Sequence, residues 1–361
     1  MNSFSFGALA TVALCASAQA TDTAWSGLDQ EINSLSASLA TQGTTGPKVG
    51  GYIITAFDYE ADPPGLGVDL NNNGAIEAGT EANTPFIGDD TSGWDFRFVR
   101  LQVKGDLGHD YSYMVSFDLG TGSAELEDAF VDWKITDGIQ GRWGRYRVPF
   151  ARSALVSDAK LLFLQRTAIG ESLDFRDLGA SVSGQFEMVR FWLNVQNGSD
   201  GIVKDMFINA RVTMDIMGEG VSLIEGAYGA SDAIGMSIGG AIGDDTGLDD
   251  GLRWLLEAAF VSGPFSFAAE VADFDADVGD NTPWDATASF LFTEQYEIAA
   301  RYEDFDDGDA DTTATTLGLN RYVSGHDIKW TLQYRRIDTD FEPNSIAFDR
   351  DQVAVGLTVA F

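Results

Sequence analysis

The end of the chain, residues 353–361, alternates between large apolar and small or polar side chains. The large apolar side chains are Val353, Val355, Leu357, Val359 and Phe361. A period of two predicts a β-strand with one apolar face. An exposed strand of a soluble domain gains little from an aromatic last residue. The pattern is instead typical of the last strand of a transmembrane barrel whose outer face meets lipid.

The start of the chain, residues 1–20, is typical of a secretory signal peptide. An apolar run covers residues 4–16, and Ala18-Gln19-Ala20 supplies a small-x-small cleavage pattern, although residues 1–3 carry no Lys or Arg. The run is too short to span a bilayer as a helix. Its removal takes away Cys15, the only cysteine, which excludes a disulfide framework or a thiolate metal site in the exported chain.

Composition also favours a barrel. After the signal no apolar stretch approaches the roughly 20 residues that a transmembrane helix needs, and the 24 Phe, 10 Tyr and 8 Trp are spread over short segments. The formal net charge of −34 argues against binding nucleic acid. The acidic excess lies outside residues 97–176, where acidic and basic residues balance. It indicates either loops that face water and ions or general adaptation to salt.

Residues 21–45 form a segment of their own on the periplasmic side. Apolar side chains follow a 3,4 spacing: Trp25, Leu28, Ile32, Leu35 and Leu39. This is the a/d pattern of a coiled coil, but it lasts only about two heptads. Two interpretations stay open: a small trimeric coiled coil, and a single amphipathic helix with a linker.

Residues 46–361 are predicted to form an all-β domain, a sixteen-stranded antiparallel transmembrane barrel. The predicted strands are 49–57, 94–105, 111–119, 126–135, 139–147, 176–185, 187–196, 206–216, 220–230, 251–261, 264–274, 285–293, 296–305, 314–322, 327–337 and 351–361. Ala233–Ala241 could add a strand, but an even strand number places it inside a long loop, 231–250. A charge facing lipid at mid-membrane costs about 2–4 kcal/mol, so Arg190, Lys329 and Arg335 are expected to face a wet lumen.

Residues 94–198 resemble the phosphate-selective porin O and P family of Gram-negative outer membranes. The resemblance rests on an ordered series of segments: 97–107, 111–118, 127–133, Gly144-Arg145-Tyr146-Arg147-Val148-Pro149-Phe150, Gln165-Arg166 and 176–180. It implies an outer-membrane porin, a homotrimer in contact with outer-membrane lipid, with loops folded into each barrel. In phosphate-specific members arginines line the pore and lysines sit at the constriction.

The basic residues that match this pattern, together with Lys160 from the loop, are the predicted selectivity residues. They are Arg100, Lys104, Arg142, Arg145, Arg147, Arg152, Lys160, Arg166 and Arg176. Three acidic residues, Asp118, Asp128 and Asp132, are expected on the same lumen side. Arginines alone favour anions or phosphate, whereas opposed Arg and Asp rows are typical of a general porin. Anion preference, a general or cation-preferring pore and a non-conducting structural barrel therefore stay open.

Residues 148–175 are too apolar for a free external loop. They contain Leu155 and the run Leu161, Leu162, Phe163 and Leu164. We expect this loop to fold into the barrel, with packing against a neighbouring protomer as the alternative. The preceding strand is ambiguous, because turning Ile139 and Trp143 to lipid would carry Arg145 and Arg147 outward unless a bulge intervenes.

Two further kinds of site were considered. Asp69, Asn71, Asn73 and Glu77 resemble the first part of a calcium-binding loop, although Thr80 occupies the twelfth position. This predicts either a structural calcium ion or a plain Asn/Gly-rich loop, and no other cofactor. Catalysis is not expected, because both histidines, His109 and His326, lie in short turns without a nucleophile motif. The sequence thus predicts passive diffusion of small solutes and ions.

Overall fold

The computed structural model divides the chain into two units, residues 1–47 and residues 48–361. The structure describes residues 46–61, 64–66, 85–87, 90–198, 205–230, 233–246, 251–274, 282–307, 310–341 and 346–361. The predicted signal peptide, the coiled-coil segment and the calcium-binding residues Asp69, Asn71, Asn73 and Glu77 lie outside the described residues. Among those described, no helix is long and apolar enough to cross a membrane.

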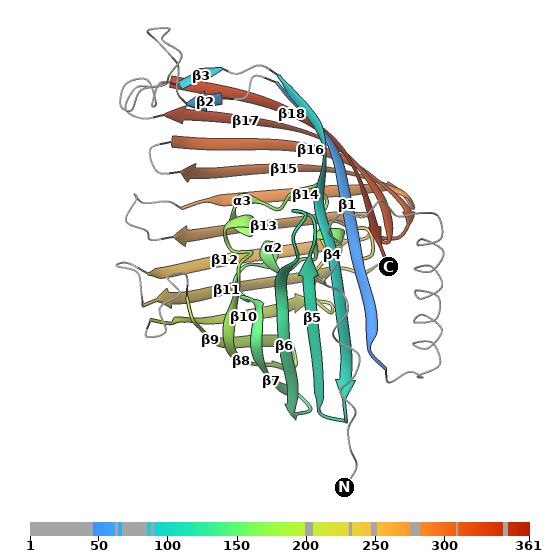
Figure 1. The fold of residues 1–361 in the computed structure, drawn as a ribbon, viewed down its shortest axis with the longest axis vertical. Coiled ribbons are helices and arrows are strands. Elements are labelled where there is room, and N and C mark those ends of the chain that lie inside the picture. The colour runs from blue at the N-terminus through green and yellow to red at the C-terminus, as the bar shows by residue number, and fades with distance from the viewer. Residues whose placement is uncertain are drawn as a thin grey trace, which may run out of the picture. The chain divides into compact units, whose positions relative to one another are not determined.

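The second unit is a closed antiparallel barrel of sixteen strands, in which β1 pairs with both β4 and β18 (Figure 1). The barrel strands are β1 (Lys48–Ala61), β4 (Thr91–Leu107), β5 (Tyr111–Asp118), β6 (Glu125–Thr136), β7 (Ile139–Arg147), β8 (Arg176–Phe186), β9 (Val189–Gln196), β10 (Phe207–Met217), β11 (Gly235–Asp245), β12 (Leu252–Ser262), β13 (Phe265–Phe274), β14 (Trp284–Thr293), β15 (Tyr296–Asp307), β16 (Ala310–Ser324), β17 (Ile328–Phe341) and β18 (Ile346–Ala360). Two short strands, β2 (Pro64–Leu66) and β3 (Pro85–Ile87), pair with each other outside it. The predicted fold class is confirmed.

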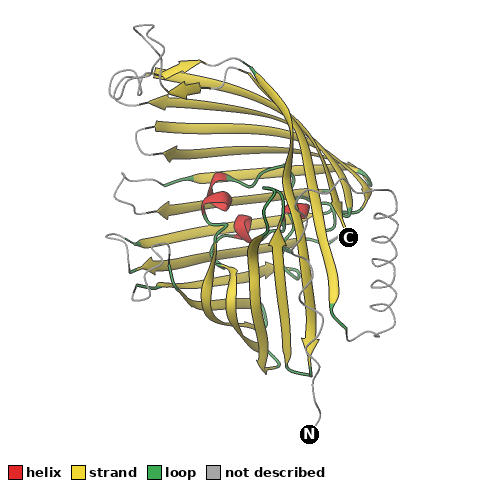
Figure 2. Cartoon of the chain, viewed as in Figure 1, coloured by secondary structure: helices red, strands yellow, loops and turns green. Residues whose placement is uncertain are grey.

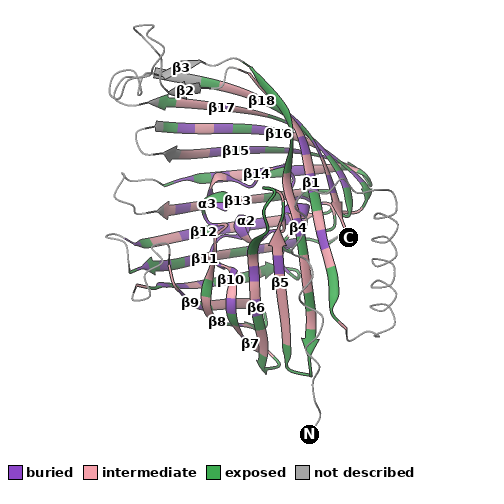
Figure 3. Ribbon diagram, viewed as in Figure 1, coloured by how far each residue is buried: buried purple, intermediate pink, exposed green. Residues whose placement is uncertain are grey.

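Side chains alternate across the barrel wall as the sequence predicts. On β18, Val353 and Val355 are 40% and 39% exposed on the outer face, whereas Ala354 and Thr358 are each 2% exposed on the inner face. The same alternation runs along neighbouring strands (Figure 3). Phe361 closes the ring, because its backbone N–H and C=O both bond to Gly51 on β1 at 3.0 Å.

One predicted strand is wrong. Residues 220–230 form no barrel strand, and the strand lies instead at β11, inside the segment 231–250 that the sequence predicts to be a loop. β11 contains four glycines, Gly235, Gly239, Gly240 and Gly243, which have low β-propensity and read as loop residues. Pairing with β10 on one edge and β12 on the other overrides that propensity.

The two ends of the barrel differ. At one end, here called the turn end, short connections join the strands: 108–110, 137–138, 187–188, 263–264, 294–295 and 325–327. The opposite end is called the loop end. Residues 218–230, between β10 and the turn end of β11, do not form a short turn. They enter the lumen, where Val221 packs on Ala259 and Val261 of β12, and are called the insert.

Candidate functional site: a narrowed lumen

Residues 148–175, here called the inward loop, leave β7 at the loop end and fold into the lumen. They contain three short helices, α2 (Arg152–Leu155), η1 (Asp158–Lys160) and α3 (Ala168–Ser172). Figure 2 shows these helices between the barrel walls. The loop packs on its own barrel, as expected from its apolar residues.

Apolar contacts hold the inward loop to the wall. Val148 and Phe150 pack with Phe207 and Leu255, while Leu162 and Phe163 pack with Ala299. Gly318 gives Phe163 room, because a Cβ there would lie 2.8 Å from the phenyl ring. Gly356 does the same for Leu164, whose Cδ2 would lie 2.3 Å from an added Cβ. The wall therefore carries glycine where the loop's large side chains approach it.

Carboxylates from four adjacent strands also bind the loop. Glu257, Glu270, Asp285 and Glu303 stand side by side in the sheet register and are here called the carboxylate row. All four are at most 8% exposed. Glu257 and Glu270 accept from the backbone N–H groups of Arg152 and Ser153 at 2.9 Å, and Glu303 accepts from that of Ala168 at 2.7 Å. These donors are the first N–H groups of α2 and α3, which have no partner within a helix.

A buried ion-pair network stabilises the loop internally. Arg166 contacts Asp158 at 2.5 Å and Asp174 at 3.0 Å, and Arg147 contacts Asp174 at 2.6 Å. Burial acts to raise the pKa of Asp158. The guanidinium groups of Arg166 and Arg147 and the hydroxyl of Tyr52 outweigh it and hold this pKa below its usual value.

The space left open is a passage along the opposite wall. A cavity of about 390 Å³ lies between strands β1 and β4–β8 on one side and the inward loop on the other. It is lined by Tyr52, Arg100, Gln102, Met114, Ser116, Asp128, Phe130, Arg142, Arg147, Leu155, Ser157, Asp158 and Arg176. The Tyr52 hydroxyl donates to Asp158 at 2.5 Å and so joins the wall to the loop.

Each of the four arginines that line the passage is ion-paired. Arg100 contacts Asp118 at 3.1 Å, and Arg142 contacts Asp132 at 2.7 Å and stacks on Phe130, 3.7 Å from the ring centroid. Arg147 pairs with Asp174, and the pairs of Arg176 include Asp128 at 3.5 Å. Cationic and anionic groups are thus interleaved, which fixes the guanidinium groups and lowers their net field.

The other predicted basic residues lie in different places. Lys104 shares the inner face of β4 with Arg100 and is exposed. Arg152 and Arg166 are 8% and 3% exposed within the packed interior, so they support the loop and do not line the passage. Lys160 lies at the end of η1 and is half-buried.

The predicted position of Arg145 in the lumen is wrong. Arg145 pairs in register with Leu178, which is 52% exposed on the outer face, and it follows Trp143, 67% exposed on the same face. Alternation therefore carries Arg145 outward, away from the lumen. Arg147 still reaches the inward loop, because the strand ends there and its guanidinium donates to Ala154 O at 2.6 Å.

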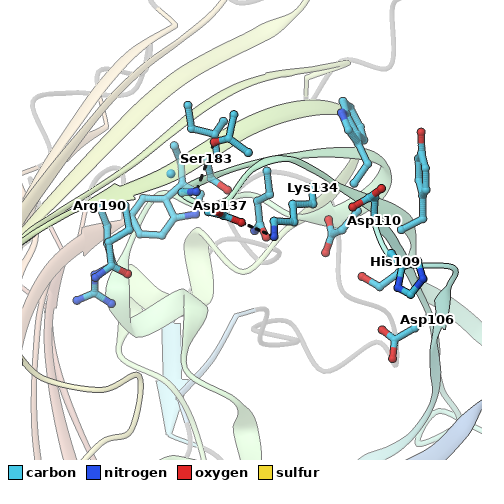
Figure 4. A pocket seen from close by; sticks show the side chains of 18 of the residues that line it. Asp106, His109, Asp110, Lys134, Asp137, Ser183 and Arg190 are labelled. Carbon is cyan, nitrogen blue, oxygen red and sulfur yellow. Dashed lines mark hydrogen bonds and ion pairs between the residues drawn. The ribbon is translucent and has the colours of Figure 1, made fainter. Parts of the chain in front are cut away.

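Two larger cavities are also present in the barrel unit. A vestibule of about 840 Å³ at the turn end is lined mostly by polar side chains, including Asp106, His109, Asp110, Lys134 and Arg190 (Figure 4). A second space of about 850 Å³ lies on the side that includes Arg97, Arg335 and Arg350. The described residues contain no group of three or more His, Cys, Asp or Glu side chains suited to a metal ion.

Sequence reasoning missed the residues that hold the insert. Tyr228 of the insert stacks on Tyr322, with ring centroids 3.7 Å apart, and its carbonyl lies 3.2 Å from His326 Nε2. Glu297 accepts from Ala227 N at 2.6 Å and from the Tyr322 hydroxyl at 2.6 Å. No pattern in the sequence links these residues, since they come from separate strands and turns.

His326 gives this contact a defined pH dependence. Burial, together with the positive charges of Lys329 and Lys160, lowers its pKa to about 4 against the opposing effect of the Tyr228 carbonyl and of Asp327. A folded-state pKa below the unfolded value of about 6.5 means that this stabilisation is complete above that pH and is lost as pH falls through about 4. We expect the protection factors of the amides in residues 221–230, which are exchange rates corrected for the intrinsic effect of pH, to fall over this interval in the wild type. In His326→Gln these protection factors should vary little, and an equal fall in both proteins would contradict this.

Comparison with solved structures identifies the fold. The anion-selective porin from Comamonas acidovorans superposes with a TM-score of 0.57 at 15% identity, over 88% of this chain and 99% of that chain. The outer-membrane channel DcaP of Acinetobacter baumannii superposes with a TM-score of 0.55 at 10% identity, over 87% and 97%. A loop-deletion mutant of OmpT from Vibrio cholerae gives 0.56 at 11% identity, over 88% and 99%. The fold is that of a porin.

Sequence comparison matches part of the chain to a known family. Residues 74–214 match the model of the family described as phosphate-selective porin O and P. An uncharacterised protein of Aquifex aeolicus is 24% identical over 293 residues, covering 67% of this chain and 69% of that protein. The closed barrel, its narrowed lumen and this match define an outer-membrane porin of a Gram-negative bacterium.

Proposed function

We propose that the porin lets small hydrophilic solutes and ions diffuse passively through the passage with weak charge selectivity. The observation that carries this is the pairing of all four arginines that line the passage with carboxylates. A paired guanidinium keeps hydrogen-bonding capacity for a passing solute but presents little net charge. Opposed charges in a narrow pore orient dipolar solutes rather than exclude one sign of ion.

Anion preference is the second candidate. It is favoured by the lining itself, where four arginines face two aspartates, Asp128 and Asp158. The porin of similar fold from Comamonas acidovorans is anion-selective, which agrees with this candidate. A cation-preferring pore is less favoured by this lining.

Assembly is a further part of the proposal. We propose that export removes residues 1–20 and that the mature chain forms a homotrimer in the outer membrane. The heptad spacing of residues 25–39 supports association of three chains.

The test is single-channel recording in a planar bilayer under a KCl gradient, followed by titration with phosphate. The proposal predicts a reversal potential near zero, with a permeability ratio within about threefold, and no block by submillimolar phosphate. A reversal potential on the chloride side with phosphate block would establish anion preference instead. Absence of channels would contradict both candidates.

A further inference from the structure

The insert, residues 218–230, makes close contacts with the inward loop from the turn end of the barrel. We propose that it is a buttress that fixes the position of the inward loop and thereby sets the largest solute that the pore admits. This inference rests on the proposed function, because a size limit is meaningful only for a conducting channel.

The insert and the inward loop satisfy each other's polar groups. The Arg152 guanidinium donates to three carbonyls of the insert, those of Val221 at 3.4 Å, Ile224 at 3.1 Å and Ser222. In the opposite direction, Glu225 N donates to Lys160 O at 3.2 Å. The bond from Arg152 to the Val221 carbonyl is buried and those to Ser222 and Ile224 are partly buried, so movement of either segment would leave donors or carbonyls of the other unpaired.

Glu225 connects the loop, the insert and the wall. Its carboxylate accepts from Leu162 N of the loop at 2.9 Å and pairs with Arg301 of β15 at 3.1 Å. Arg301 is 1% exposed and also donates to Gln165 O at 3.1 Å. Glu225 therefore contacts the loop directly, through Leu162 N, and indirectly, through Arg301, which donates to the loop at Gln165 O.

These anchors stand on the side of the loop that faces away from the passage. Arg301, Glu297 and Tyr322 belong to β15 and β16, whereas the passage is lined by β1 and β4–β8. The loop is thus held between the insert and the passage. Loss of the insert's contacts would let the loop retreat from the passage or move within the lumen, and both changes alter the cross-section open to solutes.

The test compares Glu225→Ala and Glu225→Gln with a matched control, Glu219→Gln. Glu219 lies in the same insert and is exposed. Alanine removes both the acceptor and the charge, while glutamine keeps an acceptor for Leu162 N. We expect unitary conductance in 1 M KCl to rise in the order wild type, Glu225→Gln, Glu225→Ala, by about 1.5- to 2-fold at the end of the series. Glu219→Gln should match the wild type.

A second measurement addresses size directly. Neutral polyethylene glycols that enter a pore lower its conductance, so the largest polymer with an effect gives the size limit. We expect this limit to move to larger polymers in Glu225→Ala and to stay unchanged in Glu219→Gln. Glu225→Asp, which keeps the charge, should show a smaller change than Glu225→Ala in both measurements.

The outcomes separate the two proposals. If the wild type forms no channels, the proposed function fails. If it conducts but Glu225→Ala keeps both the wild-type conductance and the wild-type polymer limit, the buttress is overturned. A folding defect does not imitate the expected result, because misfolded chains reduce the number of insertion events rather than change the conductance of each channel.

Discussion

Replacing Arg166 by methionine is expected to free the inward loop and to make the channel current noisier. Arg166 and Asp158 are each 1% exposed at their side chains and lie 2.5 Å apart. Removing one partner of a buried ion pair leaves the other uncompensated, which costs about 3–5 kcal/mol. Arg166 also donates to Ser153 O at 2.6 Å, so the variant loses a link between α2 and the rest of the loop. The measurement is single-channel recording of open-state current fluctuations.

The pH dependence of this variant has a definite sign. In the wild type the pKa of Asp158 is below its usual value, so its stabilising effect is present above about pH 4 and is lost in acid. Without Arg166, burial is less opposed and the pKa of Asp158 rises. A raised carboxyl pKa favours the protonated form, so the added noise should decline as pH falls.

The double variant Asp158→Asn/Arg166→Met is the control for charge. It removes both members of the pair and leaves no buried charge without a partner, so its current should be quieter than that of Arg166→Met. A double variant as noisy as the single one would show that the loop depends on packing and backbone contacts of Arg166 and not on the ion pair.

Replacing Arg142 by glutamine is expected to shift the channel toward cations. Arg142 forms two parallel hydrogen bonds with Asp132, at 2.7 and 2.8 Å. The substitution removes a positive charge from the passage and leaves Asp132 facing the lumen with its compensation lost. We expect the potassium-to-chloride permeability ratio to rise by about two- to fivefold, measured as the reversal potential in a KCl gradient.

The same strand offers a control of equal chemistry. Arg145 lies three residues further along β7 but faces outward beside Leu178. Arg145→Gln should therefore leave the reversal potential unchanged. Equal shifts in Arg142→Gln and Arg145→Gln would mean that distant surface charge, rather than the passage lining, determines selectivity.

The strands could be predicted because a lipid-facing barrel imposes a period of two on every segment that crosses the membrane. β11 shows where this signal fails. Its glycines carry little hydrophobic pattern, and its pairing with β10 and β12 is decided by neighbours that lie elsewhere in the chain. The insert gave the converse error, because Val221 and Ala230 pack in an apolar cluster inside the lumen and produce a pattern that resembles a strand.

The site was predictable to a smaller extent. The inward fold of the loop could be predicted because its leucines are unfavourable in water. Four of the predicted basic residues line the passage: Arg100, Arg142, Arg147 and Arg176. Sequence could not show that Arg152 and Arg166 are buried supports, because burial depends on how the loop folds. It also could not show which carboxylate neutralises each arginine, since the partners come from other strands and from the loop.

The carboxylate row has a consequence for how the protein matures in the membrane. The hydrogen bonds that it makes to the inward loop join residues 105, 117 and 135 positions apart in the chain. Contacts so distant in sequence form late, because the intervening chain must first be ordered. The amides of Arg152, Ser153 and Ala168 thus find these partners only after β12–β15 have joined the sheet. The inward loop therefore stays without these partners until that part of the barrel wall has assembled, and the narrow passage takes its final shape only afterwards.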